Sequence, residues 1–178
     1  MRQPRRRAFT LVEVTAVIVL VALVAGAVTL RVRGTMRRAT LAQTVDEWAG
    51  FDRLTRVLAE SRRRPMSLVI DMGLGQVSRL DSDGVTEVGA ALTLPEELTI
   101  AEVRLADGRR GWGRADVPYS SRGLSPTYAV CLEDDRGGRR WVLFAGLTGQ
   151  RIEVDSDEAL QAMFDVSARP NGGQDHGR

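Results

Sequence analysis

The stretch that decides the fold runs from Arg6 to Glu13 and reads Arg-Arg-Ala-Phe-Thr-Leu-Val-Glu. It joins a basic segment, residues 1–8, to an apolar segment, residues 9–30. At 1.5 Å per residue, a helix over 9–30 would be about 33 Å long, close to the ~30 Å hydrocarbon core of a bilayer. Basic residues before such a helix keep the N-terminus in the cytoplasm. The sequence therefore predicts one membrane-spanning helix, with the rest of the chain on the far side.

Glu13 is the acidic residue within this apolar segment. A carboxylate in such a helix is costly in lipid and is usually functional, unless it lies close enough to the interface to stay solvated. An ordinary signal peptide cleaved near residues 25–27, or a plain single-span anchor, would also have a basic flank and an apolar run. Signal peptides do not usually carry an acid in the apolar region, so Glu13 favours a helix that meets a positive partner on assembly.

The residues from Arg6 to Glu13 resemble the prepilin peptidase site of type IV pilins and type II secretion pseudopilins. The resemblance implies cleavage between Ala8 and Phe9, methylation of the new Phe9 amine, and an assembly role for Glu13. The family strongly prefers Gly before the cut, and this chain has Ala8 there. Glu13 of one subunit could neutralise the Phe9 amine of a neighbour, so that two charges costly in lipid form one pair.

Beyond the apolar segment, apolar residues continue at helical spacing as far as Leu58, and Pro65 predicts the end of the helix near Arg63. The apolar positions are Leu41, Val45, Trp48, Phe51, Leu54 and Leu58. The intervening polar residues, Asp52 and Arg56 among them, are expected on the solvated side. The predicted organisation is a leader (1–8), a transmembrane and fibre-assembly helix (9–30), its amphipathic continuation (31–64), a β-rich domain (65–164) and a disordered tail (165–178).

The residues after Pro65 read as short strands separated by turns. Strands are expected at 66–71, 76–80, 85–88, 98–105, 127–133 and 139–147, with turns at 81–84 and 134–138 and a long loop at 106–126. A short helix is expected at 155–164, capped by Asp155 or Ser156. This order predicts an α+β fold, one long helix packed on an antiparallel sheet.

The same fold is implied by the resemblance to pilins. Three segments are similar to the minor pseudopilin class called general secretion pathway protein H and its FimT-type pilin relatives: residues 63–71, 123–125 and 141–149. That resemblance implies a minor pseudopilin of a type II secretion pseudopilus. It also implies a place in the bacterial inner membrane as a single-pass protein, with a cytoplasmic N-terminus and a periplasmic C-terminal domain that enters a periplasmic fibre.

The implied partners are other pseudopilins or pilins through the 9–30 helix, the prepilin peptidase, the inner-membrane assembly platform and, through the 106–126 loop, a secreted protein. An alternative is a minor type IV pilin of the FimT kind, acting in pilus assembly or DNA uptake. That role needs clustered arginines. The candidates flank Trp112 and are Arg104, Arg109, Arg110, Arg114 and Arg122.

Net charge argues against a nucleic-acid-binding domain. The formal charge of the chain is +2, but four of the 25 basic residues, all arginines, precede the expected cleavage site. The remainder has 21 basic against 23 acidic residues, a net of −2. The positive charge therefore belongs mainly to the leader, where it sets topology.

The sequence predicts no catalytic residue, no cofactor and no metal site. It has no G-x-S-x-G, phosphate-loop or zinc-ligand pattern. Cys131 lies in an apolar run and is expected to be a small buried residue of a strand. Asp134 and Asp135 could be read as a pair of catalytic carboxylates. However, they fall at a hairpin tip, which is a poor place to desolvate an acid, and adjacent strand residues face opposite sides of a sheet.

Overall fold

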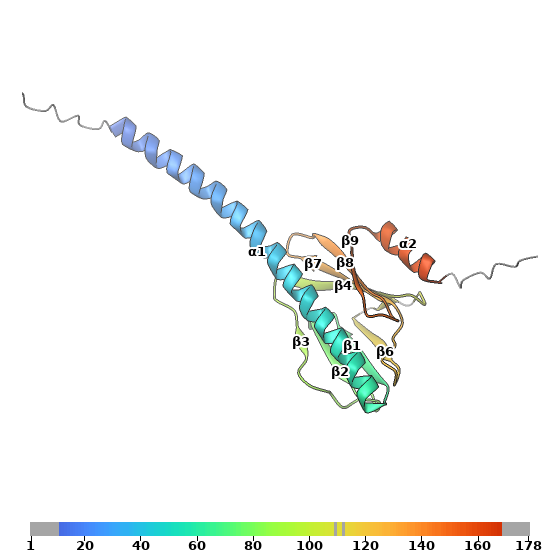
Figure 1. The fold of residues 1–178 in the computed structure, drawn as a ribbon. Coiled ribbons are helices and arrows are strands. Elements are labelled where there is room, and N and C mark those ends of the chain that lie inside the picture. Colours follow the sequence, from blue (N-terminus) through green and yellow to red (C-terminus); the bar gives the residue numbers. More distant parts are fainter. Residues whose placement is uncertain (1–10, 109, 112, 169–178) are drawn as a thin grey trace, which may run out of the picture. The chain divides into compact units, whose positions relative to one another are not determined.

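The computed structural model describes residues 11–108, 110, 111 and 113–168, with the side chains of 27–38, 110 and 166–168 left out. Along the chain the elements are α1 (Leu11–Arg62), β1 (Met66–Asp71), β2 (Gln76–Leu80), β3 (Leu92–Thr93), β4 (Leu98–Leu105), β5 (Arg110–Gly111), β6 (Arg114–Tyr119), β7 (Tyr128–Asp134), β8 (Arg139–Phe144), β9 (Arg151–Val154) and α2 (Asp157–Ala168) (Figure 1). The leader, the Ala8–Phe9 junction and most of the predicted tail, 169–178, lie outside the described residues. The chain divides into two compact units, Met1–Ala42 and Gln43–Arg178.

In the first unit the described residues are helical from Leu11 onward, as the sequence predicts. Their side chains are exposed as far as Gly26. Within the part of the chain that the structure describes, no helix combines the length and the apolar character needed to cross a membrane.

Helix α1 ends at Arg62, one residue before the predicted end. The N–H of Arg64 donates to the Ala59 carbonyl at 3.2 Å, and the N–H of Arg63 donates to the Glu60 carbonyl at 3.1 Å. These two bonds form a Schellman motif, which satisfies carbonyls left open at a helix end. Arg63 adopts φ 53° in this motif, at the position where glycine is the usual residue.

The strands form two antiparallel sheets, where the sequence led us to expect one. The first sheet has the order β3-β2-β1-β6 and the second the order β5-β4-β7-β8-β9. The predicted strands 66–71, 76–80 and 98–105 are confirmed as β1, β2 and β4, and both 127–133 and 139–147 are confirmed with shifted ends as β7 and β8.

Three of the expectations for the β region are wrong. Residues 85–88 make an isolated bridge, Leu80 to Glu87, and no strand. The expected loop at 106–126 contains β5 and β6, and β9 was not expected. Helix α2 is confirmed near its predicted place, with Ser156 as its cap: the Ser156 Oγ accepts the Ala159 N–H at 3.2 Å.

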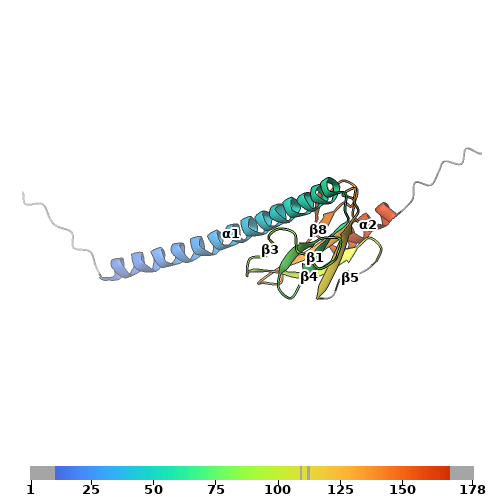
Figure 2. The ribbon, with the colours of Figure 1, turned by 90° about the horizontal axis from the view of Figure 1, so that it is seen from below.

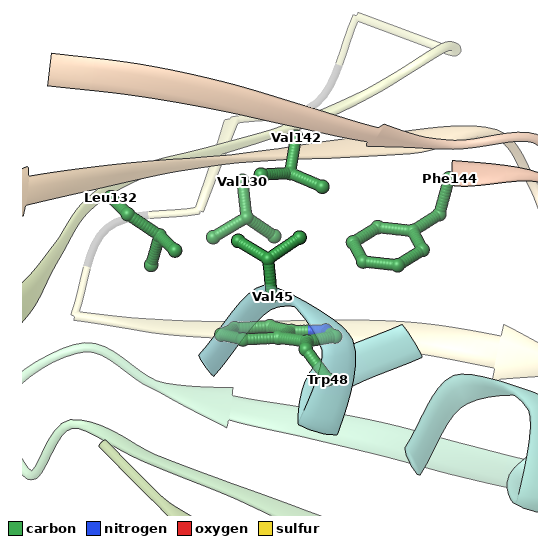
Figure 3. Close-up of a pocket in the computed structure, with 6 residues that line it drawn as sticks. All are labelled: Val45, Trp48, Val130, Leu132, Val142 and Phe144. Atoms are coloured by element: carbon green, nitrogen blue, oxygen red, sulfur yellow. The ribbon is translucent and has the colours of Figure 1, made fainter. Parts of the chain in front are cut away.

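The second sheet is covered on both faces, which explains why its central strands are apolar at consecutive positions. Toward α1, Val130, Leu132, Val142 and Phe144 line a small apolar gap together with Val45 and Trp48 (Figure 3). Toward α2, Ala129, Cys131, Trp141 and Leu143 pack in a core cluster with Leu160 and Phe164. In Figures 1 and 2 the strands β7 and β8 accordingly lie between the C-terminal part of α1 and α2. Burial on both faces replaces the alternating pattern of a one-sided sheet.

The face that α1 turns to the sheets differs from the predicted one. Val45, Trp48 and Phe51 are buried as expected, but Leu54 is 46% exposed. The buried face of α1 instead includes Asp52, which is 1% exposed, and Thr55, which is fully buried. The expectation that Asp52 lies on the solvated side is therefore wrong.

Candidate functional site

The first candidate site is the apolar helical segment at the start of α1. Large apolar side chains are exposed all along it, from Leu11 (83%) to Leu23 (68%) and Val24 (58%). Monomeric soluble proteins rarely expose a contiguous apolar surface of this extent, so the segment is suited to contact lipid or other helices.

Glu13 lies in the first described turn of this segment, and it is exposed. Its neighbours along the helix, Val12 and Val14, are exposed as well. The cleavage residues Ala8 and Phe9 lie outside the described residues. Glu13 is thus an exposed acid between apolar neighbours.

The second unit contains a buried polar cluster centred on Asp52 and Arg56. The Asp52 carboxylate accepts the Tyr128 hydroxyl at 2.9 Å, the Tyr119 hydroxyl, and the Arg56 Nε at 2.7 Å. The side chain of Asp52 is 1% exposed and that of Arg56 is 11% exposed. A buried carboxylate is tolerated only when paired and hydrogen-bonded, and these three donors meet that requirement.

Arg56 also ties two loops to α1. Its guanidinium donates to the Gly146 carbonyl at 2.6 Å, to the Gly123 carbonyl at 3.2 Å and to the Ser125 Oγ at 2.9 Å. Gly123 and Ser125 belong to the loop after β6, and Gly146 belongs to the loop after β8. The two loops are also joined directly, because the Ser125 N–H donates to the Gly146 carbonyl at 3.2 Å. One side chain therefore fixes the surface that these loops form.

Burial sets the protonation of the cluster. Burial and the Asp52 charge raise the pKa of Tyr119 well above its usual value, and burial, with the neighbouring Tyr119 and Asp52, does the same for the pKa of Tyr128. Burial acts to lower the pKa of Arg56, but its hydrogen bond to Asp52 and the charge of Asp52 outweigh this and raise it. Both tyrosines therefore stay neutral donors and Arg56 stays cationic, which is a stable structural arrangement.

Sequence reasoning missed this cluster, although a signal for it was present. Asp52 follows Trp48 by four residues and Val45 by seven, which places it on the same helix face. Its polar character led to the opposite assignment. Arg56 follows Asp52 by four, the spacing at which an acid and a base pair on a helix.

Of the five arginines predicted to bind DNA, the three whose side chains the structure describes do not form a free basic patch. Arg104 bonds to Glu102 at 2.8 Å and to Asp157 at 3.0 Å, and it stacks 4.4 Å from the Trp141 ring. Arg114 pairs with Asp116 at 3.4 Å. Arg122 is exposed, whereas Arg109, Trp112 and the side chain of Arg110 lie outside the described residues.

The other residues singled out from the sequence have structural places. Cys131 is a buried free thiol in β7, as predicted, and burial raises its pKa to about 11. Asp134 accepts the N–H groups of Arg136 and Gly138 at 2.9 and 2.8 Å and so stabilises the β7–β8 turn. Among the residues that the structure describes, no group of three or more His, Cys, Asp or Glu is placed to hold a metal ion.

Comparison with known proteins gives a motif and a fold. Residues 3–29 match the model of the prokaryotic N-terminal methylation motif. No curated protein sequence matches the chain. Among solved structures, the fold is similar to the minor pseudopilin EpsH from the Type 2 Secretion System of Vibrio cholerae, with a TM-score of 0.52 and 12% identity over 65% of this chain and 95% of that one.

The type IV minor pilin FimU of Pseudomonas aeruginosa gives a TM-score of 0.48 and 13% identity over 65% of this chain and 89% of that chain. The motif and the fold agree with the architecture described above, in which α1 packs on antiparallel sheets. The chain therefore carries a prokaryotic N-terminal methylation motif, and its fold is pilin-like, similar to that of the minor pseudopilin EpsH.

Proposed function

We propose that this protein is a minor pseudopilin subunit of a type II secretion pseudopilus, which takes part in protein export across the outer membrane. The observation that carries the proposal is the methylation motif over residues 3–29, which includes the exposed apolar start of α1. The likeness of its fold to EpsH, a minor pseudopilin of a type II secretion system, favours a pseudopilus over other pilin-like fibres.

Processing would begin at the inner membrane. A prepilin peptidase cuts between Ala8 and Phe9 and methylates the Phe9 amine, and the helix over 9–30 holds the subunit in the membrane with its C-terminal domain in the periplasm. On entry into the fibre, Glu13 pairs with the Phe9 amine of a neighbouring subunit. The pair neutralises two charges in an apolar setting and sets the register between subunits.

The second unit would supply shape and contacts in the fibre rather than chemistry. The Asp52–Arg56 cluster gives it two loops with a fixed conformation, and Leu124 (40% exposed) and Leu147 (79% exposed) lie on them. These loops are suited to contact another pseudopilin, the assembly platform or a secreted protein. The subunit is a structural component and not an enzyme.

The proposal is tested by the N-terminal residue of the mature protein. The full chain is co-expressed with a prepilin peptidase, and the intact mass is measured with and without the peptidase. We expect a mass that starts at Phe9, with one added methyl group. A mass starting after Ala27 would indicate an ordinary exported domain, and an uncut Met1 would indicate a plain anchor; either result contradicts the proposal.

The alternative, a minor type IV pilin that captures DNA, is less well supported. Two of the five arginines that it would use, Arg104 and Arg114, are engaged with carboxylates. A duplex DNA binding measurement separates the two roles, because capture of DNA predicts affinity that falls steeply with salt.

A further inference from the structure

The first sheet contains a buried arginine without a carboxylate partner. Arg79 belongs to β2 and is 6% exposed. Among the arginines whose side chains the structure describes, it is the most enclosed. Within the described part of the chain, its side chain bonds to a hydroxyl and a carbonyl and to no acid. A buried guanidinium is costly unless an anion neutralises it, so Arg79 lacks the partner that its position calls for.

The other two arginines that turn inward both have carboxylates. Arg56 pairs with Asp52 at 2.7 Å, and Arg104 pairs with Glu102 at 2.8 Å. Burial acts to lower the pKa of Arg56, but the Asp52 bond and charge outweigh it, and the hydrogen bond to Glu102 raises the pKa of Arg104. Burial lowers the pKa of Arg79. The setting of Arg79 therefore differs from theirs in having no acid among the described residues.

The contacts of Arg79 hold its guanidinium in one orientation against α1. Its Nε donates to the Thr55 Oγ1 at 3.0 Å, and the Thr55 hydroxyl in turn donates to the Phe51 carbonyl at 2.8 Å. The guanidinium carbon lies 3.4 Å from the centroid of the Phe51 ring. On the other side, Nη1 lies 3.5 Å from the Val88 carbonyl oxygen. The group is thus positioned before any anion arrives.

The outer part of the guanidinium is left without a protein partner. An arginine side chain has five N–H donors. The bonds of Nε and Nη1 account for two of them, and Nη2 has no partner among the described residues. Of the fully enclosed side-chain N and O atoms that the structure describes, Trp48 Nε1 alone lacks a partner, so Nη2 keeps contact with the surface. An anion from outside can therefore reach Arg79.

The acids nearest to Arg79 in sequence are turned elsewhere. Asp83 accepts two N–H groups and a hydroxyl of its own turn, and Asp81 accepts the next N–H in the chain. Glu87 lies opposite Leu80, which follows Arg79 in β2. Adjacent strand residues face opposite sides of a sheet, so Glu87 does not share the side of Arg79. These acids leave the guanidinium available to another anion.

The rim beside Nη1 is a glycine. Gly89 is exposed, and a Cβ at this position would lie 3.3 Å from Arg79 Nη1. The φ of Gly89 is +78°, a conformation that glycine adopts without strain. The backbone of residues 88 and 89 can therefore lie along β2, where the Val88 N–H donates to the Arg79 carbonyl at 2.8 Å, without a side chain covering the guanidinium.

We propose that Arg79 is the centre of an anion site that takes a carboxylate from outside the chain, either a free carboxylic acid or an acidic side chain of another protein. The planar fork of a guanidinium matches a carboxylate in shape. One carboxylate also balances one guanidinium in charge, whereas a phosphate group carries nearly two charges at neutral pH. The site goes beyond the proposed fibre function and needs neither cleavage before Phe9 nor Glu13.

The test measures thermal unfolding of the full chain in detergent, in sodium acetate against sodium chloride of equal ionic strength. Acetate should raise Tm by about 4 °C or more and the rise should saturate, because the ligand binds only the folded state. Arg79→Met keeps an unbranched stem over Phe51 but has no charge, so it should abolish the rise. Arg53→Met is the matched control, an exposed arginine of α1, and should keep it.

Two further variants separate binding from a structural role. In chloride, Arg79→Met should be at least as stable as the parent chain, because it removes a buried charge without leaving an acid unpaired. Arg56→Met should lose stability, because Asp52 stays behind. Arg79→Lys keeps the charge but not the fork, so half of the full rise should need several times more acetate. This variant decides the question if Arg79→Met does not fold.

Two blocked peptides distinguish the sources of the carboxylate. A rise in Tm with acetyl-Gly-Glu-Gly-amide and none with its Gln counterpart would assign the site to an acidic side chain of a protein. A rise with acetate and none with either peptide would assign it to a free acid.

Four results would overturn the proposal: no saturable rise with acetate, a rise that persists in Arg79→Met, an unchanged acetate requirement in Arg79→Lys, or an equal rise with inorganic phosphate. None of them affects the proposed function, which depends on the start of the mature chain at Phe9. Conversely, an uncut chain whose Tm still responds to acetate through Arg79 would remove the fibre proposal and leave the anion site in place.

Discussion

The Tyr128 hydroxyl donates a hydrogen bond of 2.9 Å to Asp52 Oδ1, across 76 residues of sequence. Asp52 belongs to α1 and Tyr128 to the start of β7, so this bond joins the helix to the second sheet. The first sheet reaches the same oxygen through Tyr119 of β6. One buried carboxylate oxygen thus connects α1 with both sheets.

Removal of Arg56 should destabilise the second unit strongly. Arg56→Ala leaves the buried Asp52 carboxylate without its cation and removes the side-chain hydrogen bonds to the carbonyls of Gly123 and Gly146. Losing one partner of a buried pair costs about 3–5 kcal/mol. Urea unfolding measures the change. Arg53→Ala is the matched control, because Arg53 is an exposed arginine of the same helix, and it should stay within about 0.5 kcal/mol. Equal effects of the two substitutions would contradict the assignment of the cluster.

Substitution of Gly123 should cost more than substitution of another glycine with positive φ. A Cβ at Gly123 would lie 2.8 Å from the Arg56 carbonyl oxygen, and its φ is +71°. Gly137 has φ +78° but nothing within 4 Å of the added Cβ. Gly137→Ala therefore carries only the conformational cost, roughly 1 kcal/mol, and Gly123→Ala should exceed it. A smaller loss for Gly123→Ala in thermal unfolding would mean that the loop is not held against α1.

The Cys131 thiol should be nearly inert in the folded protein. Burial raises its pKa to about 11, and α2 packs over it with Leu160 and Phe164. Labelling with a maleimide at pH 7–8 should be slow in buffer and fast in urea. Because the folded pKa is raised, the stability linked to this thiol is fully present below its unfolded pKa, about 8.5, and is lost as pH rises through about 11. Fast native labelling would show that α2 does not cover β7.

Glu13→Val should leave the folded domain unchanged and prevent incorporation into fibres. The substitution lies in the first unit, outside Gln43–Arg178, so the thermal unfolding of the second unit should match that of the parent chain. Sheared fibre fractions, compared with the membrane-bound subunit, measure incorporation. Glu13→Asp keeps the negative charge, so this variant should still be incorporated into fibres in part. Normal incorporation of Glu13→Val would exclude the charge pair with Phe9.

The sequence was sufficient for elements with a regular pattern between clear turn signals. The bounds of β1, β2 and β4 are those expected, because each is a short run rich in β-branched and other apolar residues. Strand β6 was missed because Pro118 and the glycines on either side of it, Gly113 and Gly123, are typical of a loop. Proline is tolerated there because β6 is an edge strand of the first sheet.

The polar part of the core could not be predicted in the same way. Asp52 is buried only because the hydroxyls of Tyr119 and Tyr128 reach it from two sheets, and nothing local in the sequence pairs these residues. Helical spacing can place a residue on a face, but it does not reveal which distant donors will satisfy it. Glu13, in contrast, could be singled out from the local sequence alone, because it is an acid within an apolar segment.

The second sheet, covered by a helix on each side, constrains how this sequence can change. Residues 128–132 and 141–144 are buried at every position, whereas a one-sided sheet accepts a polar residue at every second one. A change of volume at Val130 or Val142 must be accommodated by α1, and one at Ala129 or Leu143 by α2. Because both helices pack on the same strands, substitutions in β7 and β8 affect both of them. We therefore expect the sequences of α1 and α2 to change together between relatives.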